Sequence, residues 1–346
     1  MSTSSEIITI ADRDITITNG DKIFFPERGF TKRDLVNYYV AVADGALVGV
    51  HNRPTVLKRF VNGAAGDFFF QKRVPESRPL WMETATVHFP SGRSATLLST
   101  ADTAHLIWAI NLGCIDLNPW PVRSTDLDHP DELRVDLDPT PQASFADVRT
   151  LALVIQEIFD EIGYTGYPKT SGSRGIHINV RIEPKWDFGT VRRCALALGR
   201  EVERRIPALA TTAWWKEQRH GVFIDYNQNA RDRTVASVYS VRPTPDARVS
   251  CPLDWDELKD AELEDFRLDT VPGRYAQRGD PGAGIDNKSH SLEPLLELMQ
   301  RQEAEGQGDA PWPPNFAKQE GEPKRVQPSR DKDRKKPKSK LKKKAG

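Results

Sequence analysis

Residues 169–182 hold two strand-like runs joined by a turn that is too short to contain a helix. The sequence KTSGSRGIHINVRI places small and glycine residues, 171–175, before an alternating apolar run. Because parallel strands need a crossover of about a dozen residues or more, strands joined this closely pair antiparallel. Amphipathic helices are indicated elsewhere by apolar residues at helical spacing in 145–162 and 188–206. The sequence therefore predicts an α+β fold, with mixed or antiparallel sheets flanked by helices.

Three other segments have the branched or alternating residues of strands. They are ELRVDLDP at 132–139, GVFIDY at 221–226 and TVASVYSV at 234–241. A helix is expected from Thr31 to Ala43, because an acid follows the threonine at the spacing of a capping box. No internal repeat occurs, so these segments belong to one folded body and not to a repeat array.

Charge is divided unevenly along the chain. The 346 residues contain 49 Lys and Arg and 49 Asp and Glu, so the formal net charge is zero. Residues 324–344 contain twelve basic and two acidic residues, which puts +10 on this segment and −10 on the rest. From about residue 305 the chain is rich in Gly, Pro, Gln and Lys and lacks periodicity. We therefore expect a folded domain over residues 1–304 and a disordered linker and basic tail over residues 305–346. Such a tail suits a polyanionic partner or serves only to keep the protein in solution.

Several classes of protein are excluded by what the sequence lacks. No run of about 18 apolar residues could cross a membrane. The start of the chain does not have the basic and then apolar stretch of a secretory signal. Cys114, Cys194 and Cys251 are too widely separated for a metal clip. We expect a cytoplasmic protein.

Two acidic side chains lie two residues apart at the end of the segment 132–139. Neighbours at this spacing share one face of a strand, with Cα atoms about 6.6 Å apart, so Asp136 and Asp138 could reach the same divalent ion or two adjacent ions. A third acid, Asp225, follows apolar residues, where a carboxylate is costly unless it is ionically paired. Three such carboxylates favour a two-metal site for displacement at phosphorus. The alternative is a strand end whose acids only cap a turn or a helix.

The turn in 171–175 has the groups that bind an anion. Gly172 and Gly175 allow backbone amides to face a ligand, and Ser171, Arg174 and His177 offer hydroxyl, guanidinium and imidazole donors. The glycine spacing matches neither the P-loop nor the dinucleotide fingerprint. An ordinary hairpin turn is the alternative. A carboxylate cluster and a phosphate-binding turn on neighbouring strands together favour nucleotidyl transfer.

At the level of longer motifs, the chain resembles the polymerase domain of bacterial DNA ligase D, a branch of the archaeo-eukaryotic primase superfamily, and especially its stand-alone primase-polymerase members. The resemblance covers roughly residues 5–302. The motifs that carry it are NGDKIFFP (19–26), LKRF (57–60), FFFQK (68–72), HLIWAINLGCIDLNPW (105–120), VDLDP (135–139), TSGSRGIH (170–177), FIDYNQNAR (223–231) and YSVRP (239–243).

The resemblance implies a primase-like catalytic core and a template-directed DNA or RNA polymerase that fills short gaps in DNA repair. The primer 3′-hydroxyl would attack the α-phosphate of a ribo- or deoxynucleoside triphosphate, and priming is a further option. Asp136 and Asp138 would bridge two manganese or magnesium ions, and Asp225 would hold the ion that activates the hydroxyl. The implied nucleotide-binding residues are Lys58, His105, Ser171, Arg174, His177, Arg219 and Arg242.

The resemblance also implies a DNA-binding set. Asn19, Lys22 and Lys32 would hold the 5′-phosphate on the downstream side of a gap or break. Phe69 and Phe70 would stack on template bases. As bare sequence, the lysines are ordinary surface residues and the phenylalanines could belong to a core.

The chain departs from a full ligase D. It contains no KxDG tetrapeptide, the motif of a ligase module, and it has no room for a phosphoesterase module. We therefore expect a monomer, associated with the bacterial nucleoid, that acts on gapped or broken DNA and leaves sealing to a separate ligase, with DNA-end-binding repair proteins as further partners.

Two other functions fit some of the same residues. A metal-dependent nuclease could use the three acids without the turn donors. A noncatalytic DNA-end-binding scaffold could use the lysines and the tail. The sequence does not decide between excision gap filling and end joining, or between ribo- and deoxynucleotides.

Overall fold

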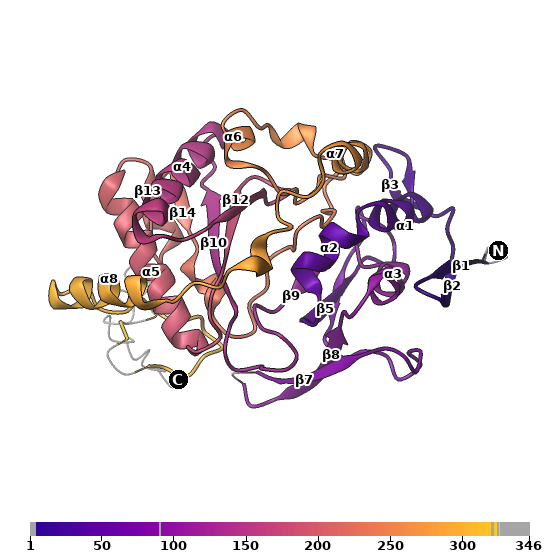
Figure 1. The fold of residues 1–346 in the computed structure, drawn as a ribbon, viewed down its shortest axis with the longest axis horizontal. Helices are drawn as coiled ribbons and strands as arrows, with labels where there is room; N and C mark the ends of the chain where they lie inside the picture. Colours follow the sequence, from indigo (N-terminus) through magenta and orange to yellow (C-terminus); the bar gives the residue numbers. More distant parts are fainter. Residues whose placement is uncertain (1–4, 90, 320–321, 324, 326–346) are drawn as a thin grey trace, which may run out of the picture.

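Two lobes form the molecule, a computed structural model that describes residues 5–89, 91–319, 322–323 and 325 (Figure 1). The N-terminal lobe, residues 5–120, lies on the right of Figure 1, and the C-terminal lobe, residues 131–325, forms the left side and the top. Its late helices α6 (Trp255–Leu258) and α7 (Val271–Arg278) extend back toward the N-terminal lobe. Among the described residues, none of the helices has the length and apolar character needed to span a membrane.

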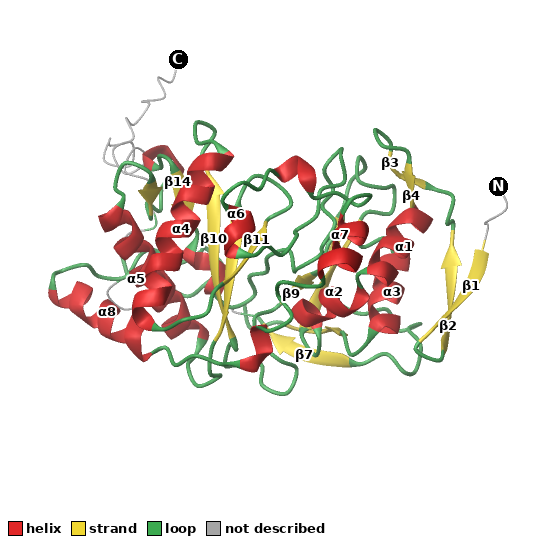
Figure 2. Ribbon diagram, turned by 45° about the horizontal axis from the view of Figure 1, so that its top comes forward, coloured by secondary structure: helices red, strands yellow, loops and turns green. Residues whose placement is uncertain are grey.

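The N-terminal lobe is built on a mixed-length antiparallel sheet in the order β6-β5-β8-β7, with β9 also paired to β5. Two small hairpins, β1-β2 and β3-β4, lie outside it, and the helices pack beside it (Figure 2). The elements are β1 (Ser5–Ile10), β2 (Arg13–Thr18), β3 (Ile23–Phe25), β4 (Phe30–Thr31), α1 (Lys32–Ala41), α2 (Ala43–Val50), β5 (Pro54–Arg59), β6 (Phe69–Gln71), β7 (Thr84–His88), β8 (Ser94–Ser99), α3 (Thr103–Asn111) and β9 (Asn118–Pro119).

The C-terminal lobe contains a five-stranded sheet in the order β11-β12-β10-β14-β13, antiparallel except for the β13-β14 pair. The mixed sheets and flanking helices confirm the predicted α+β fold. The remaining elements of this lobe are β10 (Glu132–Pro139), α4 (Phe145–Ile162), β11 (Tyr167–Thr170), β12 (Ile176–Arg181), α5 (Phe188–Arg205), β13 (Ala210–Thr211), β14 (Val222–Ile224) and α8 (Glu293–Ala304), with short 3-10 turns at Lys216–Gln218, Tyr226–Asn229, Leu263–Asp265 and Ile285–Asn287.

Alternation along β10 and β12 gives the sheet one apolar and one polar face. Leu133, Val135 and Leu137 are buried, as are their partners on β12, and α4 and α5 pack against the sheet. The intervening residues of both strands point to the opposite face. Antiparallel pairing sets Asp136 directly opposite His177. The polar face therefore carries the predicted site residues on its two central strands.

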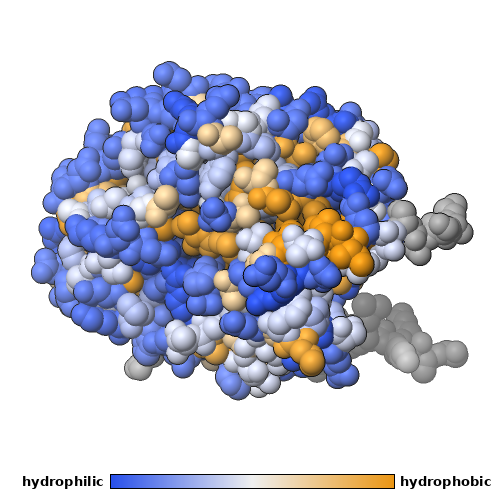
Figure 3. Space-filling view, turned by 45° about the vertical axis from the view of Figure 1, so that its right-hand side comes forward, coloured by the Kyte–Doolittle hydropathy of each residue, from blue (hydrophilic) through white to orange (hydrophobic). Residues whose placement is uncertain are grey.

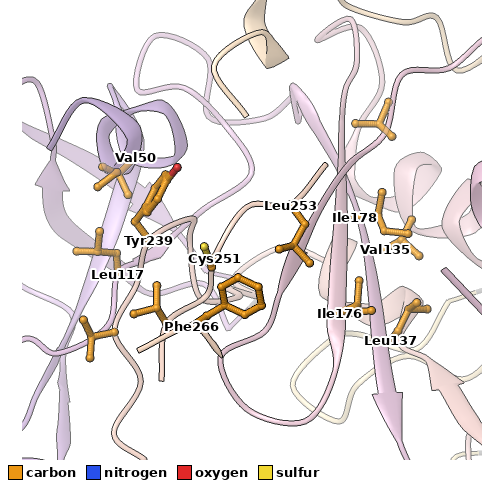
Figure 4. Packing of buried hydrophobic residues seen from close by; sticks show 14 of the residues in the cluster. Val50, Leu117, Val135, Leu137, Ile176, Ile178, Tyr239, Cys251, Leu253 and Phe266 are labelled. Atoms are coloured by element: carbon orange, nitrogen blue, oxygen red, sulfur yellow. The ribbon is translucent and has the colours of Figure 1, made fainter. Parts of the chain in front are cut away.

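A continuous apolar core and a set of buried ion pairs join the two lobes. Figure 4 shows Leu253 and Phe266 between the residues of the N-terminal lobe and the strands of the C-terminal sheet, all within one cluster. Arg53, which immediately precedes β5, is fully buried and pairs with Asp131 at 2.6 Å and 2.9 Å. Arg181 on β12 pairs with Glu132 at 3.1 Å in the same cluster. The lobes are thus held by desolvated charges as well as by apolar contacts.

The expectation of a strand at 234–241 is wrong. Residues 234–240 have no strand assignment, and Val241 makes only an isolated bridge. The N–H of Ser237 donates to Leu117 and that of Tyr239 to Ser250, so the partners lie in two separate segments and no ladder forms. Tyr239 also has a positive φ of 57°.

Disorder from residue 305 onward is also wrong for the part of this segment that the structure describes. Trp312 is buried, and Asp309 makes an ion pair of 2.8 Å with Arg192 of α5. The segment lacks periodicity because it forms no helix or strand, yet its partners on α5 hold it in place. Most of the basic tail, residues 326–346, lies outside the described residues.

Candidate active site

Three carboxylates converge on the polar face of the C-terminal sheet. Asp136 and Asp138 project from β10, and Asp225 directly follows β14, the neighbouring strand. The N–H of Asp225 donates to the carbonyl oxygen of Asp136 at 2.8 Å. One carboxylate oxygen of each residue lies within 4.8 Å of the others. The backbone pairing of the sheet therefore sets the spacing of the carboxylates.

The electrostatics of this triad disfavour three negative charges. Burial raises the pKa of Asp136 to about 6, and burial together with the charge of Asp136 raises the pKa of Asp225 to about 6. At Asp138 the charge of Asp136 is the largest cause, followed by burial, and the pKa rises to about 7. Carboxylate oxygens are the ligands preferred by hard divalent cations, and a bound cation would relieve this repulsion. The donor set therefore fits a divalent metal ion.

The turn between β11 and β12 is shaped by Ser171 and two glycines. The Ser171 hydroxyl oxygen accepts from the N–H of Ser173 and of Gly175, at 3.2 Å and 3.0 Å. Gly172 has a φ of +66°, and a Cβ there would lie 2.4 Å from Arg242. A Cβ at Gly175 would lie 2.1 Å from the carbonyl oxygen of Leu137. The turn can therefore approach β10 at Gly175, and Arg242 at Gly172, only because these positions lack side chains.

His177 faces the triad from β12. Its Nε2 lies 3.3 Å from Oδ1 of Asp136, and its Nδ1 lies 2.7 Å from Nζ of Lys169. Lys169 is buried and also donates to the carbonyl oxygen of Ala236 and to Ser250 Oγ. Burial, and then the charge of Lys169, hold the pKa of His177 well below its usual value. A neutral imidazole that accepts at Nδ1 carries its proton on Nε2, so His177 presents an N–H to the site.

Two pockets meet at Asp138. The turn pocket, of about 430 Å³, is lined by Ser171 and Arg174 among others. The Asp225 pocket, of about 540 Å³, lies beside Asp225. Arg219 lines both pockets, and its guanidinium stacks on a phenylalanine of β14. The structure therefore brings Arg219, Ser171 and Arg174 into the pockets that the carboxylates line.

Lys58 and Arg242 come together at a buried acid that the sequence analysis did not single out. Oδ2 of Asp116 lies 3.2 Å from Nζ of Lys58 and 3.7 Å from a guanidinium nitrogen of Arg242. Nε of Arg242 has no hydrogen-bond partner among the described residues. Burial raises the pKa of Asp136, and the nearby charge of Arg242 partly opposes this rise.

His105, which the resemblance places in the nucleotide-binding set, makes its contacts within the N-terminal lobe. Its Nδ1 lies 2.8 Å from Asp102, and its Nε2 accepts from the N–H of Glu83 at 3.1 Å. The ring is 1% exposed and packs edge-on against Trp81. Both ring nitrogens have partners within the N-terminal lobe, so His105 connects α3 to the segment before β7, and its contact with a nucleotide stays a prediction.

A second cationic cluster lies in the N-terminal lobe. Nζ of Lys32 donates to the carbonyl oxygen of Thr18 and to Asn111, both at 2.7 Å. Burial, and then the charges of Arg59 and Lys22, lower the pKa of Lys32 to about 8. Lys22 is exposed, and its N–H donates to the carbonyl oxygen of Asn19. Crowded cations of this kind favour an anionic ligand.

Aromatic side chains are exposed on β6 and just before it. Phe69 and Phe70 are 46% and 55% exposed, and Phe68 is 49% exposed. The exposed large apolar side chains of the described residues all come from the N-terminal lobe, and Figure 3 shows apolar side chains gathered on this side within a hydrophilic surround. Exposed aromatic faces offer stacking surfaces to unpaired bases.

Sequence reasoning missed the residues that support the triad. Asn227 donates its N–H to Oδ1 of Asp225, and the Gln228 side chain donates to Oδ2. Lys169 and Asp116 were likewise not singled out. Asn227, Gln228 and Asp116 lie within motifs already identified, and Lys169 directly precedes one; this position in the sequence was the available signal.

Comparisons with known proteins agree with this geometry. Residues 31–282 match the family model described as the LigD primase-polymerase domain. The multifunctional non-homologous end joining protein LigD of Mycobacterium bovis is 30% identical over 287 residues, which cover 78% of this chain and 37% of that protein. The bifunctional LigD of Bacillus subtilis is 28% identical, over 77% of this chain and 43% of that protein.

A solved structure gives the same result. The polymerase domain of Mycobacterium tuberculosis ligase D, in complex with DNA, superimposes with a TM-score of 0.75 at 29% identity, covering 80% of this chain and 99% of that one. The chain spans well under half the length of the curated LigD relatives described above. Since the family model covers well over half of the chain, the protein belongs to the LigD primase-polymerase domain family.

Proposed function

We propose that the protein is a template-directed polymerase of DNA repair, which extends a 3′-hydroxyl by one or a few nucleotides across a gap or break. The observation that carries this proposal is the position of Asp138, between a pocket with an anion-binding turn and a pocket beside Asp225. A nucleotidyl transfer needs a triphosphate on one side of the reacting centre and an acceptor hydroxyl on the other. The family membership supports the same reaction.

Asp136, Asp138 and Asp225 would hold two manganese or magnesium ions, which when bound would favour ionisation of the acceptor hydroxyl and neutralise the leaving pyrophosphate. The protein's own residues position the substrates. Ser171 and Arg174 line the pocket suited to the triphosphate. His177 offers an N–H beside Asp136, and Arg219 lines both pockets.

Other residues are suited to contact the incoming nucleotide or the DNA. Lys58 of the N-terminal lobe and Arg242 of the C-terminal lobe, both held at Asp116, would contact the incoming nucleotide. The cluster of Lys22 and Lys32 suits a 5′-phosphate, with Asn19 in the same loop. Phe69 and Phe70 suit stacking on template bases.

We also propose that the protein acts on broken or gapped DNA. The relatives' names refer to non-homologous end joining, and one solved relative is in complex with DNA, which favours broken or gapped DNA as the substrate. We further propose action at the bacterial nucleoid, as a monomer, followed by sealing by a separate ligase and assisted by DNA-end-binding proteins.

The test uses a one-nucleotide-gapped duplex with both strand ends labelled, with and without a 5′-phosphate. Manganese is added with ribonucleotides, deoxynucleotides or neither. Extension by one nucleotide that depends on added triphosphate is expected. Shortening of the labelled strand without triphosphate would instead indicate a nuclease, and unaltered strands that nevertheless remain bound would indicate a scaffold.

A further inference from the structure

A segment beyond the family match reaches the catalytic pockets. Residues 309–316, here called the strap, follow α8 and run along α5, whereas the family model ends at residue 282. Fully buried Arg192 of α5 anchors the strap: its guanidinium pairs with Asp309 at 2.8 Å, donates to the carbonyl oxygen of Pro311 at 2.8 Å and stacks on Trp312 at 4.2 Å. The strap is therefore held by a charge that has no access to water.

The same guanidinium also reaches the triad. Nε of Arg192 donates to Oδ1 of Asn227 at 2.9 Å, and the N–H of Asn227 donates to Oδ1 of Asp225 at 3.1 Å. A single buried side chain therefore connects the strap to the segment that carries one of the three carboxylates.

The end of the strap forms part of a pocket wall. Pro313 and Pro314 line the Asp225 pocket together with Asp138 and Asp225. The other walls include Trp214, Trp215 and the cations Lys216, Arg219 and Arg233. Flat apolar rings and cations are the groups that bind a nucleotide, by stacking and by pairing with phosphate.

We infer that the strap is one wall of an acceptor site, in which the Asp225 pocket holds the 3′-terminal nucleotide of the strand being extended. This inference rests on the proposed polymerase function and assigns its acceptor side. Asp225 lines this pocket and not the turn pocket, which has the donors that suit a triphosphate. A strand end brings a hydroxyl, a base and internal phosphates, and the walls match all three.

The test places a negative charge on the strap. Pro314→Glu is suitable because Pro314 is exposed and lines the pocket, and Ala317→Glu adds the same charge to an exposed residue of the same chain segment outside the pocket lining. Binding of a gapped duplex is measured by fluorescence anisotropy without metal or triphosphate. KM values for primer-template and for triphosphate are measured separately. Pro314→Glu should weaken binding and raise the KM for primer-template by about tenfold, equivalent to about 1.4 kcal/mol.

The KM for triphosphate should stay within about twofold, and Ala317→Glu should resemble wild type. Trp215→Ala, on another wall of the same pocket, should reproduce the primer effect. The inference is overturned if Pro314→Glu leaves duplex binding unchanged, raises both KM values equally, or matches Ala317→Glu. If wild type extends no primer, the proposed function fails, while the metal-free binding comparison still decides whether the strap contacts the strand end.

Discussion

The N–H of Asp225 donates to the carbonyl oxygen of Asp136 across 2.8 Å. This bond continues the pairing of β14 with β10, so the two carboxylates keep their separation through the backbone. Removing their charges should therefore leave the sheet intact.

The first prediction concerns metal binding. The double substitution Asp136→Asn with Asp138→Asn should abolish stabilisation by manganese and slow extension by about a thousandfold or more, since metal ions contribute several kcal/mol to the stability of such transition states. Thermal unfolding with and without manganese measures the first effect. At a free ion concentration of about one hundred times Kd, wild type should gain about 2.7 kcal/mol. Asp160→Asn, on the exposed side of α4, serves as the control and should retain the full response.

The second prediction concerns pH. An aspartate in an unfolded chain has a pKa of about 3.9, whereas the folded environment raises that of Asp138 to about 7. Between these values the folded protein binds more protons than the unfolded chain, so the free energy of unfolding falls as pH rises. In a chelating buffer, Asp138→Asn should become progressively more stable than wild type from pH 5 to pH 8. A constant difference in melting temperature across this range would show that Asp138 has an ordinary pKa in the folded protein.

The third prediction concerns the 5′-phosphate. Lys22→Gln should reduce the preference for a phosphorylated gap by about tenfold, because charge-assisted hydrogen bonds contribute about 1.5 to 3 kcal/mol. Lys22 is exposed, and its Nζ donates to the carbonyl oxygen of Val61 and to Asn62; glutamine keeps a side-chain donor, so the substitution should leave the fold intact. The measurement is the ratio of affinities for gaps with and without the phosphate. Lys288→Gln removes an exposed lysine elsewhere, and an equal loss in both variants would mean that Lys22 acts only through net charge.

The fourth prediction concerns template stacking. Phe69→Ala with Phe70→Ala should weaken binding to single-stranded template by about 1 to 3 kcal/mol per lost base contact. Both side chains are about half exposed, so little core packing is lost. Leu80→Ala removes a fully exposed apolar side chain in the same lobe and should bind like wild type. Titration of a labelled oligonucleotide compares the three proteins.

The fifth prediction concerns the basic tail. A chain that ends after Pro323 loses twelve basic and two acidic residues. It should bind DNA more weakly and with a flatter dependence on salt, since each neutralised phosphate contributes a slope of about −0.9. Affinity measured at several salt concentrations gives the slope. An unchanged slope would mean that the tail does not contact DNA.

The central strands and the triad could be predicted because their information is local. Apolar and polar residues alternate along 132–139 and 176–181, which distinguishes the two faces of the sheet. Asp136 and Asp138, two residues apart, therefore lie on the same face. The helix at Phe145–Ile162 has the predicted bounds, since Ser144 and Asp147 cap its start and Gly163 ends it.

Residues whose partners lie far away in the sequence could not be placed in this way. The sequence of the strap has no pattern that predicts an ordered structure. Its order depends on the buried guanidinium of Arg192, which lies more than a hundred residues earlier in the sequence. His105 matches a motif, but a backbone N–H at Glu83 occupies its second nitrogen. The segment 234–241 has the composition of a strand, but its hydrogen-bond partners lie in two separate segments.

The buried pair of Arg53 and Asp131 has a consequence for folding. The two residues are 78 positions apart, and each would be a costly isolated charge if one lobe were formed without the other. Neither lobe can therefore complete its interior alone, and docking of the lobes becomes part of the cooperative folding step. The molecule should unfold in one transition, with no long-lived half-folded form that exposes the N-terminal lobe by itself.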